Sequence, residues 1–237
     1  MRSIHIAFRE FSAAFRRPIA YVTLTTFLLL CGVYTFILHP YFVIGRTTLK
    51  PFFEFVPFIY TFFIPALTMG SIAEERKTRR IEALQTWPVD DSELILGKFL
   101  GVFGFLVLAL CLTITFPISI AQIGPLDWGE VIGGYLGLLL LGMSFTALGI
   151  LCSCITQNQI IAFVLGFIAC FGLYTIGHAA MYLPSPLSDG ALFLSVQDRI
   201  EDLSNGVISL RDLVYFLSIA LLALGLAGER MHGRHWR

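Results

Sequence analysis

Six apolar runs in this sequence are each long enough to cross a lipid bilayer as an α-helix, which needs about 20 such residues. The chain is 57% hydrophobic and 14% charged, with a mean hydropathy of +0.80. This is the composition of a membrane protein and excludes an ordinary soluble domain. We therefore predict an all-α integral membrane protein with six transmembrane helices. They are expected at residues 20–38, 52–72, 94–121, 131–155, 160–182 and 210–228.

Between the second and third runs, residues 74–93 carry ten charged side chains. A charge at the middle of a membrane costs roughly 2.5–3.5 kcal/mol on insertion scales, so this segment is predicted to lie in water. Glu75 and Arg79 stand four residues apart, which favours a short helix. Pro88 disfavours helical geometry in the residue before it, so the helix should end near Thr86. Lys98 is the single charged residue of the third run and lies close to its beginning.

The basic residues are distributed unevenly around these spans. With six spans, both termini and the 74–93 segment lie on the same side of the membrane. Twelve Lys and Arg residues fall on that side and four on the other. The positive-inside rule therefore predicts that both termini and the 74–93 segment are cytoplasmic.

The N-terminal residues 1–19 combine a hydrophobic face with four arginines. Ile4, Phe8, Phe11 and Phe15 share one side of a helix, which predicts an amphipathic helix lying in the membrane interface. The alternative is a charged tail that only sets the topology.

Residues 183–209 form the one sizeable segment on the opposite side. Apolar residues recur there every three or four positions, while Asp198, Glu201 and Asp202 occupy other faces. This pattern predicts an amphipathic or re-entrant helix, and an ordinary interfacial helix fits it equally well. Ser209 with Asp212, and Asp90 with Glu93, resemble the caps that begin helices, here the last and third spans.

The chain lacks the residue sets of common catalytic sites. No phosphate-binding G-x-x-x-x-G-K-[ST] motif and no H-E-x-x-H or G-x-S-x-G motif occurs. The middle of the spans holds no Asp, Glu, Lys or Arg, which carriers driven by ion gradients usually need. The five cysteines lie in apolar runs and are interpreted as small buried hydrophobic residues. We expect a non-catalytic protein with no metal and no cofactor of its own.

A polytopic protein without an energy-binding site is most simply driven by a partner. A short charged helix fixed to two membrane helices suits docking into such a partner, because its displacement moves both. A solvated loop that serves only the topology is the alternative. Two glycine pairs at four-residue spacing, Gly97/Gly101 and Gly133/Gly137, predict close approach of other helices.

Several of these residues resemble a known family. The runs 74–78, 81–89 and 96–98 resemble the signature of ABC-2 type transporter permeases, E-E-R-K-x-G-T-[IL]-E-x-L-x-T-x-P-V followed by G-K. Here Arg79-Arg80 replaces the Gly-Thr of the signature. Residues 126–129, 133–137 and 156–159 resemble the subgroup of gliding-motility-associated permeases, so the resemblance extends over nearly the whole chain.

The resemblance implies that the whole chain, 1–237, is one permease domain and half of a transporter. A separate ABC ATPase would bind ATP and Mg on the cytoplasmic side, and a second permease copy or a paralogous permease would complete the dimer. Membrane lipids are further partners, and no nucleic acid is expected. The protein would be an exporter subunit in the bacterial inner membrane. A membrane anchor for a cytoplasmic ATPase complex, without transport of its own, is the alternative.

The resemblance also assigns roles to segments. Residues 1–19 would form the connecting helix, 74–89 the coupling helix and 183–209 the outer re-entrant element. The residues expected to couple the permease to its ATPase are Glu74, Glu75, Arg76, Lys77, Thr78, Arg79, Arg80, Glu82, Leu84, Thr86, Pro88 and Val89.

Overall fold

The computed structural model describes residues 2–15, 18–38, 48–77, 91–122, 124–180, 184, 190 and 193–232, and all its regular elements are helices. In chain order these are α1 (Arg2–Phe15), α2 (Pro18–Val33), the π-helix η1 (Tyr34–Leu38), α4 (Lys50–Thr68), α5 (Ala73–Lys77), α7 (Asp91–Thr113), α8 (Thr115–Ala121), α9 (Trp128–Ile155), α10 (Gln159–Ala180), α12 (Val196–Ser204) and α13 (Leu210–His232).

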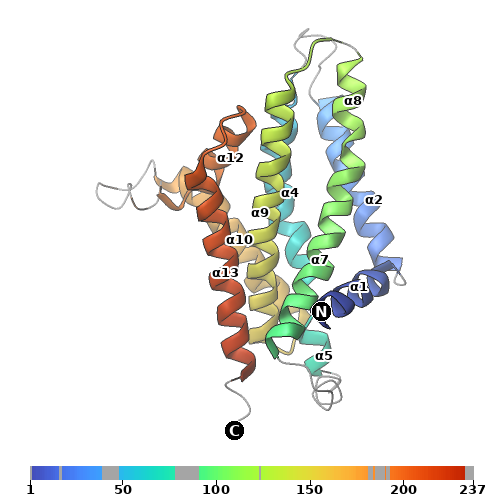
Figure 1. Cartoon of the computed structure of the whole chain (residues 1–237), viewed down its shortest axis with the longest axis vertical. Coiled ribbons are helices and arrows are strands. Elements are labelled where there is room, and N and C mark those ends of the chain that lie inside the picture. The colour runs from blue at the N-terminus through green and yellow to red at the C-terminus, as the bar shows by residue number, and fades with distance from the viewer. Residues whose placement is uncertain are drawn as a thin grey trace.

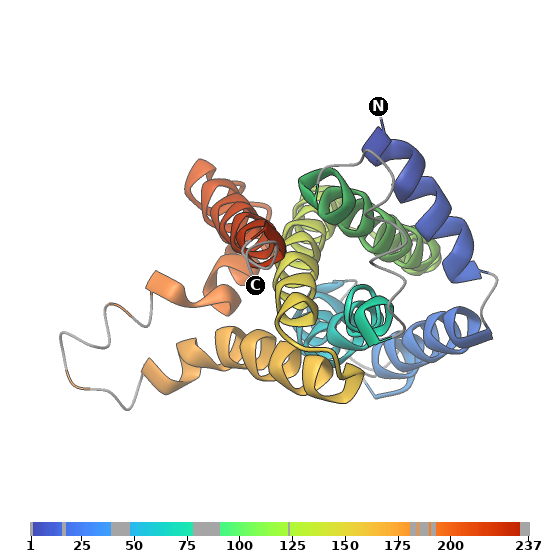
Figure 2. The ribbon, with the colours of Figure 1, turned by 90° about the horizontal axis from the view of Figure 1, so that it is seen from below.

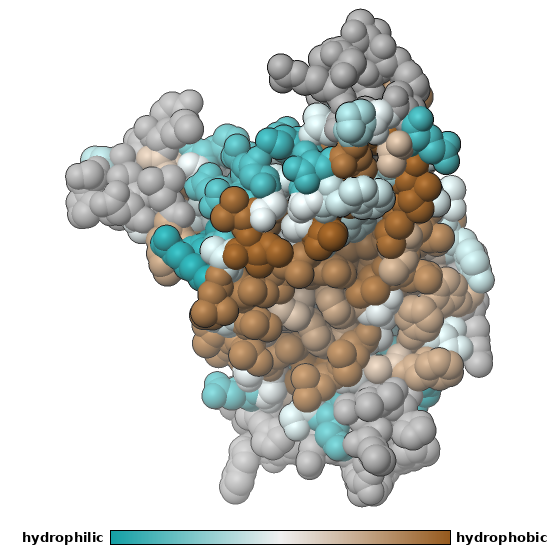
Figure 3. Space-filling view, turned by 45° about the horizontal axis from the view of Figure 1, so that its top comes forward, coloured by the Kyte–Doolittle hydropathy of each residue, from teal (hydrophilic) through white to brown (hydrophobic). Residues whose placement is uncertain are grey.

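The predicted six spans are confirmed. Six helical stretches of the described chain are long and apolar enough to cross a membrane: Ala20–Leu38, Lys50–Lys77, Ser92–Ala121, Trp128–Ile155, Gln159–Ala180 and Leu210–Met231. On the face of the bundle seen in Figure 3, hydrophobic residues form a broad band, with hydrophilic residues gathered above it and a few below it. The chain is a multi-pass membrane protein, because only a membrane would cover so much exposed apolar surface.

The bundle has two distinct ends. The short helix α5, the N-terminal helix α1 and the last turn of α13 lie at one end, here called the α5 end (Figure 1). Helices α8 and α12 lie towards the other, here called the α12 end. Helix α1 runs across the bundle rather than along it and packs against α7 (Figures 1 and 2).

Helix α9 is the centre of the fold and contacts α4, α7, α10, α12 and α13 (Figure 2). Its neighbours approach closely because glycines face them. A Cβ added at Gly134 would lie 2.5 Å from the Phe53 ring, and one at Gly142 would lie 2.7 Å from Leu106. Gly149 faces Thr68 even more closely. Small residues at helix contacts are how membrane helices gain packing without a hydrophobic driving force.

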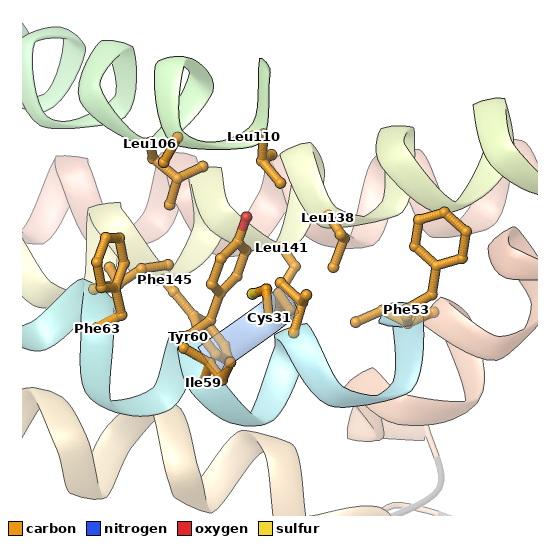
Figure 4. Packing of buried hydrophobic residues seen from close by; sticks show 14 of the residues in the cluster. Cys31, Phe53, Ile59, Tyr60, Phe63, Leu106, Leu110, Leu138, Leu141 and Phe145 are labelled. Carbon is orange, nitrogen blue, oxygen red and sulfur yellow. The ribbon is translucent and has the colours of Figure 1, made fainter. Parts of the chain in front are cut away.

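Aromatic side chains fill the space between α2, α4 and α7. Tyr60 is completely buried, and its ring packs against Phe27 with centroids 6.1 Å apart. Its hydroxyl points towards Leu106 and Leu110 of α7 (Figure 4). Burial of such large rings against one another is the main contact energy available inside a membrane.

The third span is interrupted at Ile114, between α7 and α8. Pro117 has no N–H and cannot bond to the Thr113 carbonyl, four residues earlier, so the regular helix breaks. The Tyr135 hydroxyl of α9 donates a hydrogen bond to this carbonyl at 2.9 Å. A side chain from a neighbouring helix thus satisfies the backbone group that the proline leaves open.

At the α12 end, α12 and α13 are joined by a tight connection. Gly206 has φ of 80°, and the N–H groups of Gly206 and Val207 bond to the carbonyls of Leu203 and Asp202. This is a Schellman motif, which needs a residue able to adopt positive φ. The Ser209 hydroxyl then accepts a hydrogen bond from the Asp212 N–H at 3.2 Å. The predicted cap of the last span is confirmed.

A buried ion pair fixes this connection. Arg199 of α12 donates to Asp212 of α13 at 2.8 Å and to the Phe193 carbonyl at 2.9 Å. Its guanidinium also lies 3.9 Å from the centre of the Tyr215 ring. Both charges are buried, so each depends on the other. Helix α12 is thereby held against the start of α13.

Candidate functional site: the junction around α5

Helix α5 leaves the end of α4 through the turn 69–72, and a serine from α9 holds that turn. The Ser153 hydroxyl accepts hydrogen bonds from the N–H groups of Ile72 and Ala73, at 3.1 and 3.0 Å. It donates to the Met69 carbonyl at 3.1 Å. One buried side chain therefore pairs the Met69 carbonyl at the end of α4 and two amides at the start of α5, groups that a helix leaves without internal partners.

Arg76 ties α5 to the end of α9. Its guanidinium donates a hydrogen bond to the carbonyl of Cys154, one of the last residues of α9. The carbonyls at a helix C-terminus lack internal partners and carry partial negative charge, so a cation is favoured there. The contact fixes the direction in which α5 leaves the bundle.

Lys98 of α7 lies beneath α5 and is 1% exposed. Its ammonium group is 2.7 Å from Oε1 of Glu75, 2.7 Å from the carbonyl of Ser71 and 3.4 Å from Oε1 of Glu10. An ammonium group has three N–H donors, and three oxygens from three different segments receive them. A lysine this buried is stable as a cation only with such partners.

Glu10 brings α1 into the same cluster. Helix α1 packs on α7 at Gly101, where an added Cβ would lie 2.8 Å from the Cβ of Glu10 and 3.3 Å from the Ala7 carbonyl. The predicted close approach at Gly101 is therefore confirmed, and its partner is α1. Gly133 and Gly137 likewise face Leu203 of α12.

We call these contacting residues, Glu10, Ser71, Glu75, Arg76, Lys98 and Ser153, the α5 junction. It joins α1, α4, α5, α7 and α9 at one end of the bundle (Figure 1). Helix α5 is attached to three membrane-spanning helices, because it follows α4 through the turn 69–72 and is bonded to α7 and α9.

Of the coupling residues predicted from the sequence, the structure describes Glu74, Glu75, Arg76 and Lys77. Glu75 and Arg76 face the bundle and hold α5, whereas Lys77 is exposed and Glu74 half-buried. The remaining eight lie outside the described residues: Thr78, Arg79, Arg80, Glu82, Leu84, Thr86, Pro88 and Val89. Their role as ATPase contacts stays a prediction.

Sequence reasoning missed the other half of the junction. Glu10, Lys98 and Ser153 were not proposed as functional residues, although Lys98 was noted as the one charge of its run. A lysine seven residues inside a helix that starts at Asp91 lies about 10 Å from that start. That depth is the signal that could have marked Lys98 as paired with an acid.

The fold and this junction define a polytopic helical membrane protein in which a short helix is held against the spans. Residues 52–227 match the family described as ABC-2 family transporter protein. This is well over half of the chain, and the protein belongs to that family. Members are membrane components of transporters and generally pair with an ABC ATPase. No curated protein shows significant similarity to the chain.

Proposed function

We propose that this permease exports a substrate with energy from a separate ABC ATPase, which binds α5 and the charged residues 78–89 that follow it. ATP and Mg would be held by the ATPase and not by this chain. A second permease, either a copy or a paralogue, would complete the transporter. The three short motifs at 126–159 support placing the chain in the gliding-motility-associated subgroup.

The observation that carries this proposal is the pairing of buried Lys98 with Glu75. Helix α5 is only five residues long and would not be stable alone in water. Its attachment to α7 by an ion pair and to α9 by Ser153 and Arg76 gives it a fixed position. A solvated loop needs no such attachment, whereas a docking helix that moves the spans does.

Photo-cross-linking tests the partner. A photoreactive amino acid is placed at Lys77, which is exposed beside the junction, and a matched one at Arg230, exposed at the same end of α13. We expect the ATPase to be captured from position 77 and much less from position 230. Capture of no nucleotide-hydrolysing protein at 77 would contradict the proposal.

The topology has its own test. We propose that both termini and α5 are cytoplasmic in the inner membrane, since the basic residues favour that side. Lys77→Cys and Asp202→Cys place exposed thiols at the two ends of the bundle. A membrane-impermeant maleimide should label Asp202→Cys on intact cells and Lys77→Cys only after the membrane is opened. The reverse pattern would refute the orientation.

The alternative function is an anchor that holds the ATPase without moving a substrate. Both functions require docking, but only export requires that ATP hydrolysis and the spans be coupled. In reconstituted vesicles, Lys98→Met should change the ATPase rate of an exporter, because it frees α5 from α7. An unchanged rate together with intact ATPase binding would favour the anchor.

A further inference from the structure

A cavity of about 310 Å³ opens near the α12 end, where α4, α10, α12 and η1 meet. Helix α12 contributes one stripe of its surface, since Gln197, Ile200, Glu201 and Ser204 recur at helical spacing. Helix α4 contributes Glu54 and its neighbours on the opposite wall. A cavity of this size is at the lower limit of those that bind small molecules.

The charged residues known to line the cavity are all acidic. Among the residues that the structure describes, two carboxylates, Glu54 and Glu201, line the cavity, and no Lys, Arg or His does. The nearby Arg199 does not neutralise them, because its guanidinium is committed to Asp212 and the Phe193 carbonyl. The described lining therefore carries a net negative charge, which attracts a cation.

The rest of the wall is aromatic. Tyr34 and Phe55 stack face to face with centroids 3.7 Å apart, and Phe58 lies 6.2 Å from Tyr174. These four rings line the same space as the two carboxylates. Rings together with acids are the surroundings in which proteins bind organic ammonium groups.

The side chain of Gln197 provides a further hydrogen-bond acceptor. Oε1 of Gln197 is buried and has no hydrogen-bond partner, although its residue lines the cavity. A buried amide oxygen without a donor is unfavourable, so an N–H or a polarised C–H group from a ligand would relieve it. Among the described residues, no three His, Cys, Asp or Glu side chains are close enough to hold a metal ion. The geometry fits an organic cation instead.

We propose that this cavity is a binding site for an organic ammonium group, with the carboxylates of Glu54 and Glu201 as counter-ions and the Tyr34, Phe55, Phe58 and Tyr174 rings as its apolar wall. The site goes beyond the proposed function, since binding there requires neither the ATPase nor transport. Water-soluble amines and the headgroups of aminolipids present the same chemistry.

The test uses the full-length chain in nanodiscs of phosphatidylglycerol, with tritiated choline as the probe. Its neutral isostere, 3,3-dimethyl-1-butanol, has the same shape without the charge. We expect saturable choline binding that the isostere displaces at least about tenfold less well. Equal displacement by the isostere would show a non-selective apolar crevice and overturn the proposal.

Three variants locate the binding. Glu54→Gln and Glu201→Gln should each weaken choline binding about tenfold. Asp202→Asn is the matched control, because Asp202 is the next residue on α12, is exposed and does not line the cavity. Its binding should equal that of the unchanged protein. Unchanged binding in both Glu variants, or an equal loss in Asp202→Asn, would refute the site. Thermal unfolding of each variant confirms that the fold is retained.

Changing the lipid composition distinguishes the two sources of the ammonium group, an aminolipid headgroup and a water-soluble amine. If aminolipid headgroups occupy the cavity, nanodiscs that also contain phosphatidylethanolamine will bind choline more weakly in a Glu201-dependent way. If the ligand comes from water, the added lipid will leave choline binding unchanged. Either result supports the site. Weakening that persists in Glu201→Gln would contradict it.

Discussion

Lys98 and Glu75 form an ion pair of 2.7 Å between a membrane-spanning helix and the short helix α5, with the lysine almost completely buried. The pair links the α5 end of the bundle, which we expect to face a partner, to the membrane-spanning helix α7. The pair fixes the position of α5, and we expect it also to transmit the movement of α5 to the spans.

We predict that Glu75→Gln destabilises the protein by about 3 kcal/mol, because the buried ammonium group of Lys98 loses the negative charge of its nearest carboxylate. Glu75→Gln combined with Lys98→Met should cost less than the sum of the two single changes, since the buried charge is then gone. Denaturant unfolding in mixed micelles measures both. Lys77→Gln, on the exposed side of α5, is the control and should be neutral. Additive costs would show that the two residues do not interact.

Ser153→Ala is predicted to loosen α5 without changing any charge. It leaves the N–H groups of Ile72 and Ala73 and the Met69 carbonyl without partners, at a cost of about 2 kcal/mol. Hydrogen exchange should become faster at the α4–α5 turn and not in the centre of α9. Ser119→Ala removes an exposed hydroxyl that bonds only to its own helix, and it should have little effect. Equal protection of the turn in both variants would contradict the assignment.

At the other end, Arg199→Lys keeps the charge but loses the forked geometry. Lysine cannot bond to Asp212 and the Phe193 carbonyl together while stacking on Tyr215, so we expect a loss of about 2 kcal/mol. This loss of stability should be measurable as faster hydrogen exchange along α12. Arg211→Lys, a change at an exposed arginine of the same helix as Asp212, should leave α12 protected. If both changes loosen α12 alike, the buried pair is not what holds it.

The six spans could be predicted from the sequence because their signal is local. Twenty apolar residues identify a membrane helix whatever its neighbours are. The cap at Ser209 was predictable for the same reason, since its partner Asp212 is three residues away. The short helix was also expected where α5 begins, because the charged residues 74–77 could not lie in the membrane.

The α5 junction could not be predicted because its contacts are remote in sequence. Glu10 and Lys98 are separated by 88 positions, and Ser153 lies 80 positions from Ala73. Helix packing decides which serine of a span faces a turn. A uniformly apolar span has no periodic pattern from which that serine could be identified. The glycine pairs are a second case in which the sequence could not identify the contacting partner. Their spacing predicted close approach, but only the fold reveals that the partners are the short helices α1 and α12.

The break at Ile114 gives a last prediction, which concerns Tyr135. Its hydroxyl is the partner of the Thr113 carbonyl, which Pro117 cannot serve, and Thr113 is completely buried. Tyr135→Phe should therefore destabilise the protein by about 1–2 kcal/mol. Tyr21→Phe, at an exposed tyrosine of α2, is the matched control and should change the free energy of unfolding little.

A compensating change tests the cause of that loss. Pro117→Ala restores an N–H group that can bond to the Thr113 carbonyl within one continuous helix. If the open carbonyl is the reason that Tyr135 matters, Tyr135→Phe should cost clearly less in the Pro117→Ala background than in the unchanged protein. An equal cost in the two backgrounds, measured by unfolding in the same micelles, would show that Tyr135 stabilises the bundle through its ring and not through its hydroxyl.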